Sequence, residues 1–285
     1  MKKLSKLLCL VLALTMVFAF VGCGKKTEAE KTDTNPEQQG TPSSGSDVAP
    51  AELPASDSDL GFTTVIPGKL VMSTNAAFPP YEMVADDGSF EGIDVEIAGA
   101  IAKKLGLELQ VDDMEFDAAL QAAQQGKSDI IMAGVTVTEK RLEVMEFSDS
   151  YSNGVQVIIV KNGSEVTLDN MGDYMIGTQQ GTTGYIYCSG DYGDDHVTAY
   201  DNGASAVQAL MNGQVDCVVI DSNPAKEYVK ANPGLVILDT EYANEDYAIG
   251  MAKGNFALLD AVNNALAELK ADGTVKAIVD KYIAA

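Results

Sequence analysis

The segment Ala119-Leu-Gln-Ala-Ala-Gln-Gln-Gly-Lys-Ser-Asp-Ile-Ile-Met132 decides the fold of this chain, because a second segment matches it 87 positions later. The second copy reads Ala206-Val-Gln-Ala-Leu-Met-Asn-Gly-Gln-Val-Asp-Cys-Val-Val219 and shares Ala, Gln, Ala, Gly and Asp at equivalent positions. Each copy predicts a helix, a glycine that ends the helix, and a short apolar strand. The sequence therefore predicts two related halves.

Short apolar runs and amphipathic stretches alternate around both copies. Strands are predicted at Leu70–Thr74, Leu107–Val111, Ile130–Ala133, Val155–Lys161, Ile176–Thr178, Val197–Tyr200, Cys217–Ile220 and Val236–Leu238. Ile93, Ile97, Ile101 and Leu105 lie on one face of a predicted helix. The alternation of strand and helix indicates an α/β fold with a parallel sheet in each half.

The C-terminal segment has no counterpart in the other half. It predicts a strand at Ala248–Met251 and helices at Phe256–Asp272 and Val275–Ile283. We expect this segment to return to the first lobe, so that the chain crosses between lobes near residues 151–156 and 246–250. The expected bounds are 61–154 plus 250–285 for lobe 1, and 155–249 for lobe 2.

The N-terminus predicts export and anchoring. Three lysines precede the apolar run Leu7–Val21, which is shorter than the roughly 20 residues that span a bilayer, so residues 1–22 are predicted to be a signal peptide. Gly22-Cys23 resembles the bacterial lipoprotein box, although Phe20 stands where that box usually has Leu. The resemblance implies that Cys23 becomes acylated and that the protein is extracytoplasmic, lipid-anchored to a bacterial cell membrane. Residues 23–60, rich in Pro and small polar side chains, are predicted to be a disordered tether.

The composition narrows the classes of function. A formal net charge of −23 makes nucleic acid a poor partner, because such a chain cannot replace the counterions of phosphates. Four Cys, one His and no Trp leave little material for a Cys/His metal site or for imidazole catalysis. We therefore expect no metal, no cofactor and no catalytic residue.

Arg141 is the only arginine among 19 basic residues. Its planar guanidinium suits bidentate recognition of a carboxylate better than a lysine does. It follows the predicted strand Ile130–Ala133, in a helix that Thr138 can cap. The alternative is an ordinary surface arginine, and the uniqueness and position of Arg141 favour the functional interpretation.

Three further features lie where open α/β sheets bind ligands. Gly134 and Asp221 occupy equivalent positions directly after strands of the two copies. Asp221 either caps the next helix or offers a carboxylate to an ammonium group. The loop Gly177-Thr-Gln-Gln-Gly-Thr-Thr-Gly184 presents N–H groups to an anion, unless it is only a turn. Together with Arg141, these groups suit the two charged ends of a free amino acid.

Phe78 and Phe116 follow strands of the first half and could bury a ligand's side chain, although most Phe residues belong to the core. Taken together with the other features, these residues make the chain resemble the amino-acid-binding proteins of ABC importers, solute-binding family 3, over about residues 65 to 285. The motifs that carry the resemblance are Ala77-Phe-Pro-Pro-Tyr-Glu82, Gly92-Ile-Asp-Val-Glu-Ile-Ala98, Gly134-Val-Thr-Val-Thr-Glu-Lys-Arg141, Phe147-Ser-Asp149, Gly181-Thr-Thr183 and Asp221.

The resemblance implies a periplasmic-binding-protein-like fold of type II: two Rossmann-like α/β lobes, joined by a two-strand hinge, that close over one L-amino acid. It further implies docking on membrane permease subunits, and we expect a monomer. Transferred to this chain, Arg141 with the amides of Thr136 and Thr183 binds the α-carboxylate. Asp221, the Gly134 carbonyl and the Thr136 hydroxyl bind the α-ammonium group. Phe78 and Phe116 enclose the side chain.

Asn75 and Gln179 match positions that touch the far end of the ligand. Relatives that take basic amino acids often carry Asp in place of Asn75, so the amide indicates a neutral polar ligand such as glutamine, unless a residue such as Glu82 supplies a carboxylate. A dehydratase-like enzyme and a ligand sensor are the alternatives on the same fold. No Ser/His/Asp or Cys/His set supports the enzyme, and His196 lies in an acidic stretch.

Cys188 and Cys217 are the only cysteines of the predicted lobes. They lie on a predicted helix and a predicted strand that could pack together. A disulfide and two buried thiols are equally compatible with the sequence.

Overall fold

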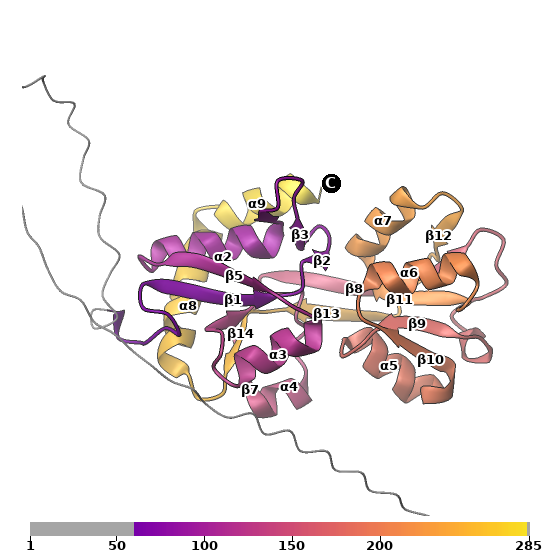
Figure 1. The fold of residues 1–285 in the computed structure, drawn as a ribbon, viewed down its shortest axis with the longest axis horizontal. Coiled ribbons are helices and arrows are strands. Elements are labelled where there is room, and N and C mark those ends of the chain that lie inside the picture. Colours follow the sequence, from indigo (N-terminus) through magenta and orange to yellow (C-terminus); the bar gives the residue numbers. More distant parts are fainter. Residues whose placement is uncertain (1–59, 284–285) are drawn as a thin grey trace, which may run out of the picture. The chain divides into compact units, whose positions relative to one another are not determined.

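A computed structural model describes residues 60–283 of the chain. The predicted signal peptide, Cys23 and nearly all of the tether lie outside these residues. No helix among the described residues is both long enough and apolar enough to cross a membrane. The described chain forms two larger β-sheets with helices around them, together with one small three-stranded sheet (Figure 1).

The first sheet has the strand order β5-β1-β6-β14-β7. Its strands are β1 (Lys69–Thr74), β5 (Glu108–Asp113), β6 (Ile130–Ile131), β7 (Met145–Phe147) and β14 (Gly250–Ala252). The helices packed around it are α2 (Ile93–Lys104), α3 (Phe116–Gln124), α4 (Glu139–Val144), α8 (Phe256–Ala271) and α9 (Thr274–Tyr282). The small sheet is β2 (Ala77–Phe78), β3 (Glu82–Val84) and β4 (Phe90–Glu91).

The second sheet has the order β10-β9-β11-β8-β12, with β13 also paired to β8. Its strands are β8 (Ser152–Lys161), β9 (Ile176–Gln179), β10 (Val197–Tyr200), β11 (Cys217–Asp221), β12 (Leu235–Ile237) and β13 (Ala243–Tyr247). Its helices are α5 (Thr183–Tyr192), α6 (Gly203–Asn212), α7 (Ser222–Ala231) and the short 3₁₀ turns η1 (Met171–Asp173) and η2 (Asp194–His196).

The repeat that predicts two halves has a structural cause. Gly126 and Gly213 follow α3 and α6 with φ of 66° and 73°, a left-handed conformation that favours glycine. The matching aspartates bond the neighbouring strand at equivalent places. Asp129 Oδ2 accepts from Val71 N at 2.7 Å, and Asp216 Oδ2 accepts from Met175 N at 2.9 Å. The shared residues therefore end a helix and fix the start of the next strand.

The sheets are mixed rather than purely parallel, which corrects the sequence-based expectation. β1 runs parallel to β5 and β6, and β9 runs parallel to β10 and β11. However, β8 is antiparallel to β11, and β14 is antiparallel to β6. The reason is that β8 and β14 each enter their sheet directly from the other one, without the returning helix that makes strands parallel.

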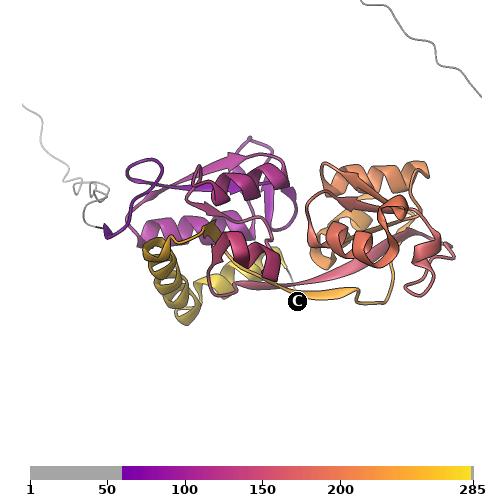
Figure 2. The ribbon, with the colours of Figure 1, turned by 90° about the horizontal axis from the view of Figure 1, so that it is seen from below.

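Two strands connect the sheets. β8 follows β7 of the first sheet, and β13 precedes β14 of that same sheet, so both connections run through this pair of strands (Figure 2). β8 and β13 pair antiparallel, from Ser152 opposite Tyr247 to Gln156 opposite Ala243. This ribbon is the two-strand hinge that the family resemblance implies.

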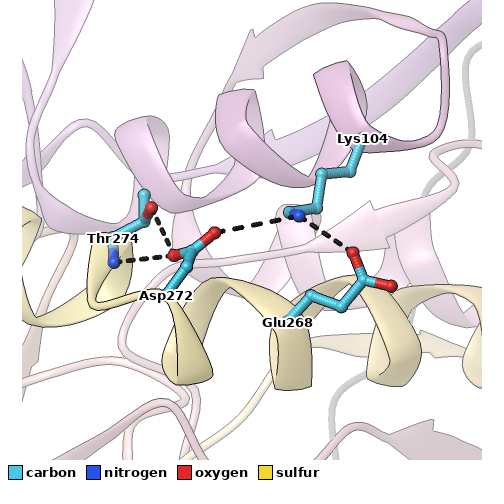
Figure 3. Close-up of polar contacts among 4 residues, drawn as sticks. All are labelled: Lys104, Glu268, Asp272 and Thr274. Atoms are coloured by element: carbon cyan, nitrogen blue, oxygen red, sulfur yellow. Dashed lines mark hydrogen bonds and ion pairs between the residues drawn. The ribbon is translucent and has the colours of Figure 1, made fainter.

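The C-terminal helices α8 and α9 pack against α2. Apolar side chains dominate the contact, with Ile97 and Ile101 of α2 and Leu266 of α8 fully buried in one cluster. Lys104 adds ion pairs to Glu268 at 2.9 Å and to Asp272 at 3.8 Å (Figure 3). These exposed pairs contribute at most about 1 kcal/mol each, so burial of apolar surface holds the helices in place.

Cys188 and Cys217 are buried free thiols. Of the two arrangements compatible with the sequence, a disulfide and two buried thiols, the structure has the second. They belong to one apolar cluster of the second lobe. Burial raises the pKa of both thiols to about 12, so neither is a reactive thiolate at neutral pH.

Candidate functional site

One cavity of about 470 Å³, part of it open to solvent, is lined by residues of both lobes. All nine residues predicted from the sequence line it: Asn75, Phe78, Phe116, Gly134, Thr136, Arg141, Gln179, Thr183 and Asp221. Gly134 follows β6 and Asp221 ends β11, so the two sheets present their carboxyl ends to the same space. This is the edge at which open α/β sheets bind ligands.

Arg141 lies at the first turn of α4 and is only 7% exposed. The Thr138 hydroxyl caps this helix by accepting from Arg141 N at 3.2 Å, as predicted. The guanidinium donates to the Thr136 carbonyl at 2.8 Å and to the Gly181 carbonyl of the other lobe at 3.2 Å. It also lies 5.6 Å from the ring centre of Phe116. Burial lowers the pKa of Arg141, while the charge of Glu245 opposes that change.

A guanidinium has five N–H donors, and the two carbonyls above take only part of that capacity among the described residues. A buried cation that lacks a partner anion is costly. The cavity therefore suits a ligand that brings a carboxylate to Arg141.

Asp221 is fully buried at the end of β11. Its Oδ1 accepts from Asn223 N at 2.9 Å, so it caps α7, and its Oδ2 accepts from Val155 N and from the Tyr247 hydroxyl, both at 3.0 Å. The capping role and a place in the cavity therefore coexist. Burial raises the pKa of Asp221 from 3.8 to about 6, and the three hydrogen bonds limit the rise. A nearby cation would favour the ionised form again.

Gly134 cannot be replaced without strain. Its φ is 54°, and a Cβ atom there would lie 2.9 Å from the Phe78 ring. Its N–H donates to Asp94 Oδ2 at 2.9 Å. Glycine thus allows the backbone to pass close to the aromatic wall of the cavity.

Thr136 and Thr183 face each other from the two lobes, with hydroxyl oxygens 3.5 Å apart. Thr183 is the first residue of α5, and Thr182 caps that helix by accepting from Tyr185 N at 3.3 Å. Because both Thr182 and Thr183 line the cavity, the positive end of the α5 dipole is directed at it.

The two phenylalanines form apolar walls of the cavity. Phe116 is the first residue of α3, and Phe78 lies in the short strand β2. Phe78 stacks on Tyr81 with ring centres 5.7 Å apart.

Asn75 and Gln179 are bonded to each other across the two lobes. Gln179 Nε2 donates to Asn75 Oδ1 at 2.9 Å, and Asn75 Nδ2 donates to the Met114 carbonyl at 3.0 Å. The sequence predicts that both residues touch the far end of the ligand, but it does not predict that they are bonded to each other.

Several cavity residues were not predicted as site residues: Glu82, Ala133, Gln156, Thr182, Val219, Ile220 and Tyr247. The sequence indicates Glu82 only as a possible source of a carboxylate for the ligand. Gln156 and Tyr247 come from the two crossing strands, where no local pattern distinguishes a cavity side chain from a core side chain. Ala133, Thr182 and Ile220 directly precede the predicted residues Gly134, Thr183 and Asp221, and this adjacency is a signal that could have extended the set.

The lobes are in contact around the cavity. Outside it, Tyr228 of α7 donates from its hydroxyl to the Ala77 carbonyl at 2.9 Å, and Asn223 Nδ2 donates to the Tyr81 hydroxyl at 3.0 Å. With the Arg141–Gly181 and Gln179–Asn75 bonds, these contacts describe a closed arrangement of the two lobes. Within residues 60–283, no group of three or more His, Cys, Asp or Glu side chains could hold a metal ion.

The family model of bacterial extracellular solute-binding proteins, family 3, matches residues 70–285 of this chain. A probable histidine-binding protein of Neisseria gonorrhoeae is 32% identical over 234 residues, which cover 79% of this chain and 87% of that protein. The ABC transporter arginine-binding protein 1 of Escherichia coli strain K12 is 29% identical over 219 residues, covering 75% and 90%.

Among solved structures, an ancestral arginine-binding protein bound to glutamine is similar, with 38% identity and a TM-score of 0.73. The match covers 77% of this chain and all of the other. These relatives are binding proteins, so the dehydratase-like alternative is set aside and this chain is not an enzyme. By the family model, the relatives and the two-lobe fold of type II, the chain belongs to the bacterial extracellular solute-binding proteins of family 3.

Proposed function

We propose that this protein captures a free L-amino acid in the cavity by closing its two lobes, and delivers it to the permease of an ABC importer. The observation that carries the proposal is that Arg141 and Asp221, both buried and from different lobes, line one cavity. A zwitterion brings each of them the opposite charge.

The remaining predicted residues complete this scheme. Arg141 with the N–H groups of Thr136 and Thr183 binds the α-carboxylate, assisted by the N-terminal end of α5. Asp221, the Gly134 carbonyl and the Thr136 hydroxyl bind the α-ammonium group. Tyr247 and Val155 hold the Asp221 carboxylate in place through Oδ2.

Closure is needed to make such a small ligand bind well. An amino acid has about ten heavy atoms, so a micromolar affinity of about −8 kcal/mol requires nearly all of them to contribute. In an open cleft the ion pairs would be solvated and worth at most about 1 kcal/mol each. The ligand therefore stabilises the closed form only through contacts that both lobes make to it at once.

The far end of the cavity favours a side chain that carries N–H donors. Glutamine is the neutral candidate, supported by the amides of Asn75 and Gln179. A basic amino acid is the second candidate, because Glu82 also lines the cavity and relatives are named for arginine and histidine.

Calorimetry of the mature protein with each of the twenty amino acids tests the proposal. We expect micromolar or tighter binding of at least one of them. Arg141→Ala should abolish measurable binding while the melting temperature of the free protein changes little, whereas Lys140→Ala, an exposed cation on the same helix, should bind normally. Micromolar binding by Arg141→Ala, or no binding of any amino acid by the wild type, would refute it.

We further propose that acylated Cys23 anchors a monomer to the outer face of the cell membrane, with residues 23–60 as its tether and the lobes bounded as the sequence predicts. Support comes from the lipoprotein-box pattern alone. Cys23→Ala should move the protein from the membrane fraction to the medium or periplasm, and equal membrane retention of the variant would contradict the anchor.

A further inference from the structure

Asn223 contacts both the carboxylate proposed to bind the ligand's ammonium group and the opposite lobe. It is the second residue of α7, and its main-chain N–H donates to Asp221 Oδ1 at 2.9 Å. Its side-chain Nδ2 donates to the hydroxyl of Tyr81, a residue of the first lobe, at 3.0 Å. Neither Asn223 nor Tyr81 lines the cavity, so this contact lies outside the proposed contacts to the ligand.

The two hydrogen bonds of Asn223 differ in how they depend on closure. Asp221 and Asn223 lie two positions apart at the start of α7, so the bond between them stays within the second lobe. The bond from Asn223 to Tyr81 joins residues 142 positions apart, from different lobes. Separation of the lobes therefore breaks the second bond and leaves the first intact.

The first lobe holds Tyr81 firmly in place. Tyr81 is fully buried, and its main-chain N–H donates to the Phe78 carbonyl at 2.9 Å. Its own carbonyl accepts from the N–H of Asp94, in the first turn of α2, at 2.9 Å. Its ring stacks on Phe78, a wall of the cavity. Because the main chain and the ring are already ordered, the hydroxyl is a preorganised partner for Asn223, and little further entropy is lost when the bond forms.

A second path leads from Tyr81 to the same carboxylate. The Tyr81 ring packs edge to face against Tyr247, with ring centres 5.4 Å apart, and the Tyr247 hydroxyl donates to Asp221 Oδ2 at 3.0 Å. Each oxygen of Asp221 is therefore connected to Tyr81, Oδ1 through Asn223 and Oδ2 through Tyr247. Tyr247 belongs to the connecting strand β13, whereas Asn223 belongs to the second lobe itself. Of these two paths, the one through Asn223 is thus the path that lobe closure makes and breaks.

We infer that Asn223 is a positioning residue that ties the Asp221 carboxylate to the first lobe and thereby keeps the lobes closed on the bound ligand; this rests on the proposed function. In the open protein, the half-buried side chain of Asn223 is hydrated and its N–H holds Asp221. After the ligand's ammonium group binds at Asp221, closure brings the Asn223 amide to Tyr81. The bond therefore stabilises the closed complex and takes no part in the first encounter with the ligand.

This order of events predicts different effects on the two rate constants. The ligand enters the open protein, so its association does not depend on the bond between Asn223 and Tyr81. Release of the ligand requires that this bond be broken. Loss of the bond should therefore raise the dissociation rate and leave the association rate unchanged. A purely structural defect would instead lower the melting temperature and the fraction of protein able to bind.

The test removes the bond from each side. Asn223→Ala deletes the amide but keeps the main-chain N–H for Asp221, and Tyr81→Phe deletes the hydroxyl but keeps the ring. Calorimetry measures the affinity for the amino acid that binds the wild type most tightly. Stopped-flow tyrosine fluorescence measures the rates, since the chain has 11 Tyr and no Trp. We expect each variant to bind about three- to tenfold more weakly, entirely through faster release, as for the loss of one neutral hydrogen bond.

The double variant, Tyr81→Phe with Asn223→Ala, should bind no more weakly than the weaker single variant, because both changes remove the same bond. Asn212→Ala is the matched control: Asn212 is exposed on α6 of the same lobe, where it accepts from Gln208, and this variant should bind as the wild type does. Unchanged affinity in either single variant, losses that add in the double variant, or slower association overturns the inference and leaves the proposed function intact. A wild type that binds none of the twenty amino acids overturns both.

Discussion

Asp221 should make ligand binding depend on pH in a defined direction. Its pKa in the empty site is about 6, raised by burial, and the ligand's ammonium group should lower it again. Binding therefore releases one proton below pH 6 and none well above it. By linkage, affinity is full above pH 6 and falls tenfold for each unit below, so at pH 4.5 it should be about 30-fold weaker, or about 2 kcal/mol.

The assay is calorimetry from pH 4.5 to 8, in two buffers of different ionisation enthalpy so that proton release is measured directly. The ligand is the amino acid that binds the wild type most tightly. Asp221→Asn should weaken binding at pH 7 by about 10- to 100-fold, because it loses hydrogen bonds to a charged partner, and should abolish this proton release. Asp149→Asn, an exposed carboxylate outside the cavity, is the control. Proton release that is absent in the wild type, or unchanged in Asp221→Asn, would refute this assignment of the ammonium-binding carboxylate.

Two further predictions concern the walls of the site and the contacts between lobes. Gly134→Ala places a Cβ 2.9 Å from the Phe78 ring, at a positive φ that favours glycine. The substitution should therefore both lower the melting temperature, measured by thermal unfolding, and weaken ligand binding, measured by calorimetry. If neither value changed, the backbone at Gly134 would have to be free to shift. Tyr228→Phe removes the hydrogen bond to Ala77 but keeps the ring, so affinity should fall about two- to tenfold although the residue does not line the cavity. Tyr242→Phe, which loses a bond to Asp191 within the second lobe, should bind as the wild type does, and equal effects of the two changes would argue against a role for contacts between lobes.

Much of the fold follows from local pattern. The stripe of Ile93, Ile97 and Ile101 is fully buried in α2, and the glycines of the repeat end their helices as expected. The antiparallel directions of β8 and β14 could not be predicted from local pattern. The direction of a strand depends on the path by which the chain enters the sheet and not on the residues of the strand itself. The predicted strand at Ile130–Ala133 is also shorter than expected, because pairing ends after Ile131.

The site was predictable where position in the repeat fixed it. Gly134 follows β6 and Asp221 ends the matching strand β11, and Arg141 stood out beside them as the only arginine in the sequence. Gln156 and Tyr247 were not predictable, because they reach the cavity only through the pairing of β8 with β13, which links residues about 90 positions apart.

The oxygen Asp221 Oδ2 accepts hydrogen bonds from Val155 of β8 and Tyr247 of β13, the two strands that connect the lobes. These hydrogen bonds link the two connecting strands directly to the carboxylate that we propose to bind the ligand's ammonium group. A ligand at this oxygen would therefore act on the connecting strands without intervening residues of either lobe. Gly154 of β8 is closely surrounded at this point. A Cβ atom there would lie 2.4 Å from the Tyr247 ring and 2.8 Å from Asp221 Oδ2, so a larger residue would disturb both the connecting strands and the carboxylate.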